Sequence, residues 1–314
     1  ISNHPGIVHA QQCGFKVIVT DHHNLPDNPV TADAIINPKQ PLCTFPYKEL
    51  SGVGVAFYLA SAIRSSLRDN KHHISYIKKL NMKYFMDLVT LGTIADVVPL
   101  TGVNRILAKA GLESLSSLPI DGIVSLFDEL GVSLNNLNGE TISFNLAPTI
   151  NAAGRLGEPN TALLALISKG HEARQFSQKL IRLNKKRKKI GESDFEKAIG
   201  LCRSAHTDKR KSLVIKGPFH DGLLGIVASR LVERFKVPAF VCCDDGSGGQ
   251  LKGSARAPDN FNLFDVISSC SRFLIKFGGH EAAAGFSLER IHFEEFKNAI
   301  NNAAILENIN KNHN

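Results

Sequence analysis

A run of β-branched residues near the start of the chain is the sequence feature that most constrains the fold. Residues 17–20 read Val-Ile-Val-Thr without polar alternation, which is typical of a strand buried on both faces of a parallel sheet. The strand ends on Asp21, His22 and His23. Ligands of open parallel sheets bind beyond the carboxyl ends of the strands. A carboxylate and two imidazoles at this point favour a metal site over a turn or a helix cap, and they suit Mn²⁺, Fe²⁺ or Zn²⁺, or Mg²⁺ if carboxylates dominate.

Length and charge bound the class of protein. The chain has 314 residues, which is enough for roughly two domains. Its 37 Lys and Arg against 29 Asp and Glu give a net charge of +8, which favours a polyanionic partner. No apolar run reaches the roughly 20 residues that cross a bilayer, and the six cysteines form no Cys-x-x-Cys pair, so we expect reduced thiols in the cytoplasm. The first residue is Ile1, not Met, so we expect a piece of a longer protein.

The remaining pattern predicts two α/β regions joined by one long helix. Apolar spacing and turn residues predict the following elements: a short helix over 4–13, a strand over 34–36, helices over 52–67, 84–91, 104–115, 170–204 and 223–235, and strands at 212–215, 239–243 and around 252–256. The Asn-rich tail from Asn301 reads as polar and frayed. The fold class is therefore α/β, with a parallel sheet in the first domain and a mixed sheet in a smaller α/β domain after the joining helix.

Three further places carry candidate chemistry, each with an ordinary alternative. Asp96 sits among small apolar residues, where a metal or a hydrogen-bonding partner would offset its desolvation; a helix cap is equally open. Arg155 follows Asn-Ala-Ala-Gly and could clamp a phosphate, although a surface arginine is the ordinary reading. Gly279 and His280 resemble a cradle of backbone amides and a ring nitrogen for an anion, or a simple glycine turn with a surface histidine.

The joining helix carries the basic run Lys-Lys-Arg-Lys-Lys at residues 185–189. Such a run is most often a solvated helix face. Because it lies between two sheet-like regions, it is also compatible with a surface that meets a phosphate backbone. The sequence leaves both interpretations open.

Several motifs occur together in one order. They read Val-Ile-Val-Thr-Asp-His-His, Gly-Thr-Ile-Ala-Asp-Val-Val-Pro-Leu, Asn-Ala-Ala-Gly-Arg-Leu, His-Asp-Gly-Leu-Leu-Gly-Ile-Val-Ala-Ser-Arg, Lys-Gly-Ser-Ala-Arg and Phe-Gly-Gly-His-Glu-Ala-Ala-Ala-Gly. In this combination the chain resembles the RecJ-like single-stranded-DNA exonucleases of the DHH phosphoesterase superfamily, from its first residue to about Phe296. The resemblance implies the C-terminal part of a DHH catalytic domain over 1–169, an interdomain helix over 170–204 and a DHH-associated substrate-binding domain over 205–314.

The resemblance also implies an activity and the residues that perform it. Single-stranded DNA would be digested from the 5′ end with Mn²⁺ or Mg²⁺ in a two-metal site. His22 and Asp96 would be metal ligands, His23 would coordinate or touch the scissile phosphate, and Asp21 would orient the imidazoles or act as a ligand. DNA phosphates would be held by the following residues: Arg155, Ser254, Arg256, Gly279 and His280. The implied setting is cytoplasmic DNA repair and recombination by a monomer, with a single-strand-binding protein or a helicase as partner and no membrane.

The chain departs from the family pattern in three respects, and each leads to a further expectation. Two family motifs with further aspartates are expected upstream of Ile1, so we predict that this polypeptide binds metal weakly and is nearly inactive. Thr149 stands where relatives often have Arg, which would remove one phosphate contact. The oligonucleotide-binding domain that usually follows in relatives is also expected to be missing.

Two other functions stay open. One is a DHH phosphoesterase for short oligonucleotides or cyclic dinucleotides, which the dependence of cleavage on substrate length would separate. The other is a non-catalytic DNA-binding scaffold, which the joint presence of Asp21, His22, His23 and Asp96 disfavours.

Overall fold

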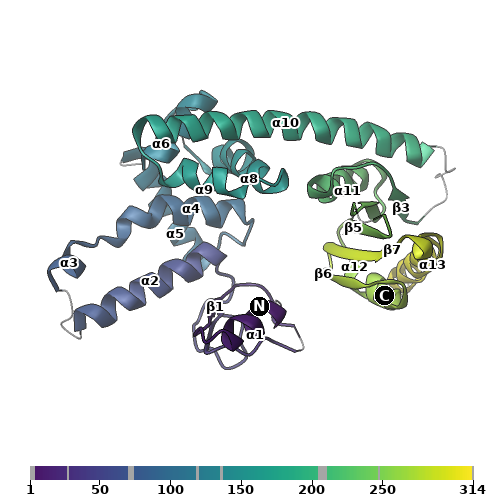
Figure 1. Ribbon diagram of the computed structural model, residues 1–314, viewed down its shortest axis with the longest axis horizontal. Coiled ribbons are helices and arrows are strands. Elements are labelled where there is room, and N and C mark those ends of the chain that lie inside the picture. Colours follow the sequence, from purple (N-terminus) through teal and green to yellow (C-terminus); the bar gives the residue numbers. More distant parts are fainter. Residues whose placement is uncertain are drawn as a thin grey trace. The chain divides into compact units, whose positions relative to one another are not determined.

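The computed structural model (Figure 1) describes residues 4–26, 28–69, 74–117, 120–134, 137–203, 211–246 and 248–312. The chain divides into two compact units. Unit 1 contains residues 1–151 and 160–181, and unit 2 contains residues 152–159 and 182–314. The long helix α10 (Gly170–Arg203) contributes to both, and the predicted boundary at 204 and 205 lies outside the described residues.

The part of the chain before α10 is mostly helical. Its elements are α1 (His4–Gln12), β1 (Ile18–Thr20), β2 (Ala34–Ile36), α2 (Gly52–Asp69), α3 (Ile74–Lys79), η1 (Met82–Phe85), α4 (Met86–Ala95), α5 (Gly102–Ser117), α6 (Asp121–Leu130), α7 (Gly139–Thr141), the π-helical turn η3 (Ile142–Leu146), α8 (Ala147–Arg155) and α9 (Pro159–Ile167). Helix α4 is central because α2 and α5 both pack against it, around Val55, Val89 and Leu107. The predicted helices over 4–13, 52–67, 84–91 and 104–115 are confirmed to within a few residues at their ends.

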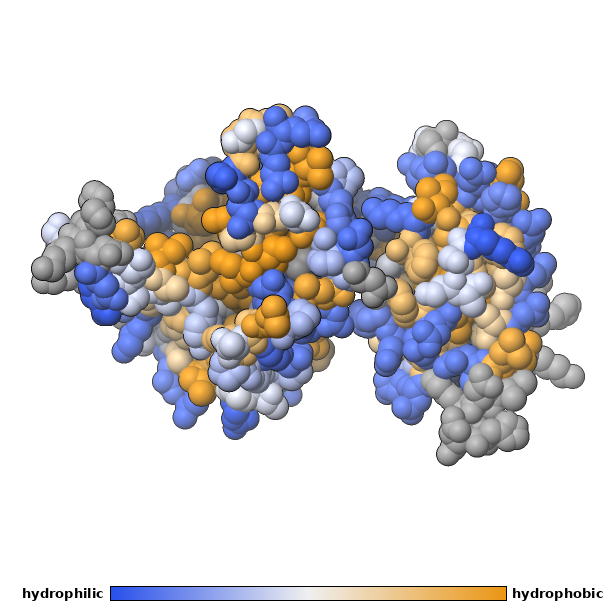
Figure 2. Space-filling view, turned by 90° about the horizontal axis from the view of Figure 1, so that it is seen from below, coloured by the Kyte–Doolittle hydropathy of each residue, from blue (hydrophilic) through white to orange (hydrophobic). Residues whose placement is uncertain are grey.

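Strands β1 and β2 form a parallel two-stranded sheet, with Ile18 opposite Ala34 and Thr20 opposite Ile36. The parallel arrangement confirms the prediction, but the prediction that this strand is buried on both faces is wrong. Ile18 is 62% exposed, and Thr20 is also exposed. Two strands offer few neighbours. Apart from β2, helix α2 is the main element that contacts β1 within the described residues, so the sheet cannot enclose its own side chains. Figure 2 shows hydrophobic residues gathered on one face of this unit.

Unit 2 contains a mixed five-stranded sheet in the order β3-β4-β5-β7-β6. Its elements after α10 are β3 (Leu213–Lys216), η5 (Asp221–Leu223), α11 (Leu224–Phe235), β4 (Ala239–Asp244), β5 (Gln250–Arg256), α12 (Leu263–Ser269), η6 (Ser271–Phe273), β6 (Lys276–His280), β7 (Ala283–Glu289), η7 (Arg290–His292) and α13 (Phe293–Asn312). Only β3 and β4 are parallel, because the crossover helix α11 connects them, whereas the other pairs are antiparallel. The mixed sheet of a second α/β domain is thus confirmed.

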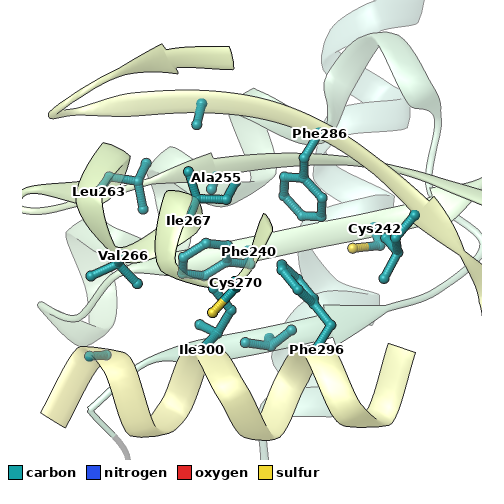
Figure 3. Close-up of a cluster of buried hydrophobic side chains, with 14 of the residues drawn as sticks. Phe240, Cys242, Ala255, Leu263, Val266, Ile267, Cys270, Phe286, Phe296 and Ile300 are labelled. Atoms are coloured by element: carbon teal, nitrogen blue, oxygen red, sulfur yellow. The ribbon is translucent and has the colours of Figure 1, made fainter. Parts of the chain in front are cut away.

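The two faces of this sheet are covered differently. One face packs on α12 and α13 through an aromatic core of Phe240, Phe286 and Phe296 (Figure 3). The opposite face of β3 and β4 packs on α11 and the end of α10. On β5, β7 and β6 that second face carries polar and small residues, and this is where the candidate phosphate site lies.

Helix α13 corrects one prediction. The tail from Asn301 reads as frayed, but the helix continues to Asn312. Phe296, Ile300 and Ala304 recur at helical spacing and are fully buried against the sheet core, so packing overrides the polar composition.

No helix in the described residues is long and apolar enough to cross a membrane. Cys202, Cys242, Cys243 and Cys270 are buried, and none of these four described cysteines forms a disulfide.

Candidate metal centre and phosphate-binding face

The Asp-His-His segment begins where strand β1 ends. The Asp21 N–H donates to the Ile36 carbonyl at 3.0 Å, which extends the ladder by one residue. The Asp21 carboxylate then turns back and accepts hydrogen bonds from the N–H groups of His22 at 2.7 Å and His23 at 3.0 Å. This side-chain-to-backbone turn fixes both imidazoles beside the end of the strand.

The Asp21 carboxylate also orients one imidazole directly. Its Oδ1 lies 2.7 Å from Nδ1 of His23. Burial raises the pKa of Asp21, but the hydrogen bonds that its carboxylate accepts, among them those from the His23 and His22 N–H groups and from the His23 ring, hold this pKa well below its usual range. Asp21 is therefore an ionised carboxylate that holds the His23 ring through Nδ1. The other ring nitrogen, Nε2, does not contact Asp21, and the ring itself is exposed.

Asp96 reaches the same place from a distant part of the chain. Helix α4 ends at Ala95, the Asp96 N–H caps the Gly92 carbonyl at 3.0 Å, and Val97 follows with a φ of 58°. The helix therefore ends at Asp96 as the alternative interpretation expected, but the backbone N–H makes the cap and the side chain has another partner. Its Oδ2 lies 3.3 Å from Nε2 of His22.

These donor atoms fit a divalent ion. Two ligand atoms that each bind a metal at about 2.1 Å and at right angles lie about 3.0 Å apart, close to the observed separation between His22 and Asp96. Within the described residues, the ligand atoms of Asp21, His22 and His23 all lie within 4.8 Å of one another. Two imidazoles with two carboxylates match Mn²⁺ better than Mg²⁺, which prefers oxygen.

The second candidate site is the open face of the sheet in unit 2. Strand register places Arg256 opposite Ala283, and Ala283 opposite His280. The next row towards the other end of these strands joins Ser254, Gly285 and Gly278 in the same way. Side chains in one row lie on the same face of a sheet, and so do side chains two residues apart along one strand. Ser254, Arg256 and His280 therefore project from the same side of the sheet.

Gly279 and His280 have separate roles in this strand. A Cβ at Gly279 would overlap the Ala283 carbonyl oxygen and lie 2.6 Å from Cα of Ala284, and its φ is 153°. The close approach of β7 therefore requires glycine here. Nδ1 of His280 accepts the Ala282 N–H at 3.3 Å, so the neutral ring carries its proton on Nε2 and presents a donor to an anion.

Arg155 ends helix α8 and reaches into the same unit. Its Nη1 donates to the Gly222 carbonyl at 3.3 Å. Burial lowers the pKa of the Arg155 guanidinium. Thr149, two turns earlier on α8, is fully buried, and its hydroxyl donates to the Asn145 carbonyl at 2.8 Å.

Arg256 is held in place by its own strand. Its Nη1 donates to Ser254 Oγ at 3.0 Å and to the Ala255 carbonyl at 2.8 Å. The pKa of Arg256 is lowered mainly by burial and to a smaller extent by the charge of Arg155. A Cβ at Gly225 would lie 2.6 Å from Nη2 of Arg256, so the first turn of α11 packs directly on this guanidinium.

Sequence reasoning missed three cations of this unit as individual candidates. Lys252 and Lys276 both oppose Ser287 of β7, which extends the polar face by one more row. For Lys252, the alternation of polar and apolar residues along β5 could have predicted its place on this face. Arg187 was treated only as part of a basic run, and its inward position could not be separated from that of its neighbours without the helix packing.

Two protein families match separate parts of the chain: the DHH family N-terminal domain over residues 1–93 and the DHHA1 domain over residues 211–305. RecJ of Bacillus subtilis, a single-stranded-DNA-specific exonuclease, is 39% identical over 300 residues, covering 94% of this chain and 36% of that protein. RecJ of Salmonella typhimurium is 40% identical over 308 residues, covering 95% of this chain and 53% of that protein. The chain thus spans about half or less of these relatives.

Solved structures agree with this similarity. RecJ of Thermus thermophilus in complex with Mn²⁺ superposes with a TM-score of 0.82 at 31% identity, covering 97% of this chain and 43% of that one. A second exonuclease RecJ bound to manganese gives a TM-score of 0.75 at 32% identity, covering 97% of this chain and 73% of that one. Because both sequence and fold match over nearly its full length, the chain belongs to the RecJ family.

Proposed function

We propose that this chain serves a metal-dependent exonuclease that degrades single-stranded DNA from its 5′ end. The observation that carries the proposal is the meeting of His22 and Asp96, 3.3 Å apart, beside the Asp21–His23 pair. A scaffold protein gains nothing from bringing imidazole and carboxylate ligands together from distant segments. The relatives named as single-stranded-DNA-specific exonucleases support the substrate.

Each residue of unit 1 has a separate task in this proposal. His22 and Asp96 would hold divalent ions, and structures of relatives in complex with Mn²⁺ or with Mg²⁺ support an ion of this kind. Such ions activate a water molecule and neutralise charge on the phosphoryl oxygens. Asp21 accepts a hydrogen bond from Nδ1 of His23, which leaves the lone pair of Nε2 free to coordinate a divalent ion beside the scissile phosphate.

In this proposal the open sheet face of unit 2 holds phosphates of single-stranded DNA. Ser254, Arg256 and His280 offer a hydroxyl and charged or polar N–H donors in adjacent rows. The small residues of β7 between them, Ala283 and Gly285, leave room for a backbone. Binding of this kind is independent of base sequence and weakens as salt rises.

The test has a binding part and a catalytic part. The 314-residue chain is expected to bind Mn²⁺ weakly in calorimetry, and His22→Ala is expected to remove that binding. The catalytic part measures Mn²⁺-dependent release of mononucleotides from 5′-phosphorylated single-stranded DNA. It compares the chain alone with the chain fused behind the N-terminal segment of Bacillus subtilis RecJ.

We expect little release by the chain alone and clear release by the fusion, abolished by His22→Ala. Absence of release from the folded fusion would contradict the proposal, and full activity of the chain alone would contradict the predicted need for further ligands. Cleavage restricted to substrates of a few nucleotides would favour the short-oligonucleotide phosphoesterase instead.

The cellular setting follows from the substrate class. We place the activity in cytoplasmic DNA repair and recombination, carried out by a monomer. A single-strand-binding protein or a helicase is the partner that would supply such DNA.

A further inference from the structure

Helix α2 touches both segments that carry the candidate metal ligands. It packs on α4, which ends one residue before Asp96, and it contacts β1, which ends one residue before Asp21. At the first residue of α2, Gly52, an added Cβ would lie 3.4 Å from Cδ2 of His22, so the start of this helix contacts the imidazole. The distance between His22 and Asp96 therefore depends on how α2 is held against α4.

Two fully buried hydroxyl groups join α2 to α4 at this point. Oγ of Ser51, the residue before α2, shares a hydrogen bond with Oγ1 of Thr93 on α4 at 2.9 Å. Ser51 Oγ also accepts the Gly54 N–H at 3.2 Å, so it caps the first turn of α2. One hydroxyl thus fixes the start of the helix and its contact with α4 at the same time.

The surrounding backbone brings this hydroxyl pair close to the metal ligand. A Cβ at Gly92 would lie 2.7 Å from Cγ1 of Val53, so α4 approaches α2 closely one residue before Thr93. The Asp96 N–H donates to the Gly92 carbonyl at 3.0 Å at the end of the same turn. Thr93 and Asp96 are three residues apart and therefore lie on one side of the helix end.

A second threonine of α4 has a different partner. Thr90 is also fully buried, three residues before Thr93, but its hydroxyl donates to the Leu107 carbonyl of α5 at 3.1 Å. Helix α5 carries none of the candidate metal ligands. Both threonines satisfy the need of a buried hydroxyl for a hydrogen bond, but only the partner of Thr93 caps the helix that contacts His22.

We propose that Thr93 is a positioning residue for the divalent ion, because through Ser51 it sets the place of His22 relative to Asp96. The inference rests on the proposed function, in which these two side chains bind the ion. Loss of a contact that supports a metal ligand lowers metal affinity by about 10–100-fold. Thr93 acts through helix packing and not by touching a ligand, so we expect a loss of about tenfold, the lower end of that range.

The test compares two variants of the 314-residue chain, Thr93→Val and Thr90→Val. Each removes one buried hydroxyl and nearly keeps the shape of the side chain, so both should lower the melting temperature of the metal-free chain by a similar amount. Calorimetry then measures the Mn²⁺ affinity of the chain and of the fusion to the Bacillus subtilis RecJ segment. Only Thr93→Val should lower it, by about tenfold, and Thr93→Ser, which keeps the hydroxyl, should retain most of the wild-type affinity.

A measurement without metal separates positioning from binding. Long-range proton–nitrogen correlation spectra of the histidine rings are recorded in EDTA, and the His22 signals are assigned by their absence from His22→Ala. The Nε2 resonance of His22 should shift in Thr93→Val, because its distance to Asp96 changes, and should keep its wild-type position in Thr90→Val.

A double-mutant cycle tests whether Ser51 and Thr93 act through one bond. The free-energy effects of Ser51→Ala and Thr93→Val on Mn²⁺ affinity should be less than additive, since each variant removes the same hydrogen bond. The effects of Ser51→Ala and Thr90→Val should be additive, because these residues have different partners. Additive effects in the first pair would exclude the route through Ser51.

The results that would overturn the inference differ from those that would overturn the proposed function. If Thr93→Val keeps the wild-type affinity, or lowers it no more than Thr90→Val does, Thr93 has a purely structural role while the proposed function stands. An unshifted Nε2 resonance of His22 in Thr93→Val would lead to the same conclusion. If neither the wild-type chain nor the fusion binds Mn²⁺, the proposed metal centre is wrong and the inference falls with it.

Discussion

Gly279 offers a sharp test of how the sheet of unit 2 is built. Strand β7 passes so close that a Cβ at this position would overlap the Ala283 carbonyl oxygen and lie 2.6 Å from Cα of Ala284. The backbone φ of 153° adds strain for any residue with a side chain. We therefore expect Gly279→Ala to destabilise unit 2, with overpacking and backbone strain acting together.

The size of the effect follows from these two contributions. Overpacking against backbone atoms that cannot move costs about 1–3 kcal/mol. An unfavourable backbone region adds about 1–2 kcal/mol. The expected loss in the free energy of unfolding is about 3 kcal/mol, which raises the unfolded fraction about a hundredfold. Gly278→Ala is the matched control, because no atom lies within 4 Å of a Cβ there, and we expect a change within about 0.5 kcal/mol.

Thiol labelling in urea measures the unfolding of unit 2 alone. Its four cysteines are buried, and burial raises the pKa of the Cys242, Cys243 and Cys270 thiols, so they react slowly in the folded state. The background carries Ser at Cys13 and Cys43, which belong to unit 1. If Gly279→Ala and Gly278→Ala shift the labelling midpoint equally, the close approach of β7 is not the reason for glycine at position 279.

The remaining predictions concern unit 1. Asp96→Asn removes an anionic ligand, so the Mn²⁺ affinity measured by calorimetry should fall about tenfold or more; an unchanged affinity would exclude Asp96 as a ligand. Asp21→Asn should lower that affinity about 10–100-fold through loss of His23 orientation while thermal unfolding stays unchanged, and intact affinity would refute the orienting role. Burial raises the pKa of Asp87, so its contribution to stability is present below its unfolded pKa and is lost as pH rises through the folded value. Asp87→Asn, which retains an acceptor for the Ile120 N–H, should therefore be better tolerated at pH 7 than at pH 4 in thermal unfolding; an equal effect at both pH values would contradict this sign.

Local patterns predicted most helices and strands because their signals are short in range. The β-branched run of β1, the apolar spacing of α4 and α11 and the buried run of β4 each reflect packing repeated every two or every three to four residues. The same local rules failed for α13, where three buried residues at helical spacing are separated by asparagines. They also failed for the burial of β1, which depends on how many neighbouring elements cover it.

The candidate metal site, too, could be predicted from the sequence only in part. The Asp-His-His segment could be recognised from the sequence because all its ligands are consecutive and follow a strand. The role of Asp96 beside His22 could not be derived from local pattern, since only the packing of α4 against α2 and the approach of α2 to β1 bring the two together.

By itself, the sequence determined the order of the elements, the α/β class, the basic charge and the residue types that can bind metal or phosphate, because these depend on periodicity and composition. The tertiary structure alone decided that Arg187 turns inward while the neighbouring lysines face solvent, and that Asp96 meets His22. It also decided that Arg256 and His280 share one open face. The physical reason is that such neighbours are set by long-range packing and strand register, which no local window of the sequence contains.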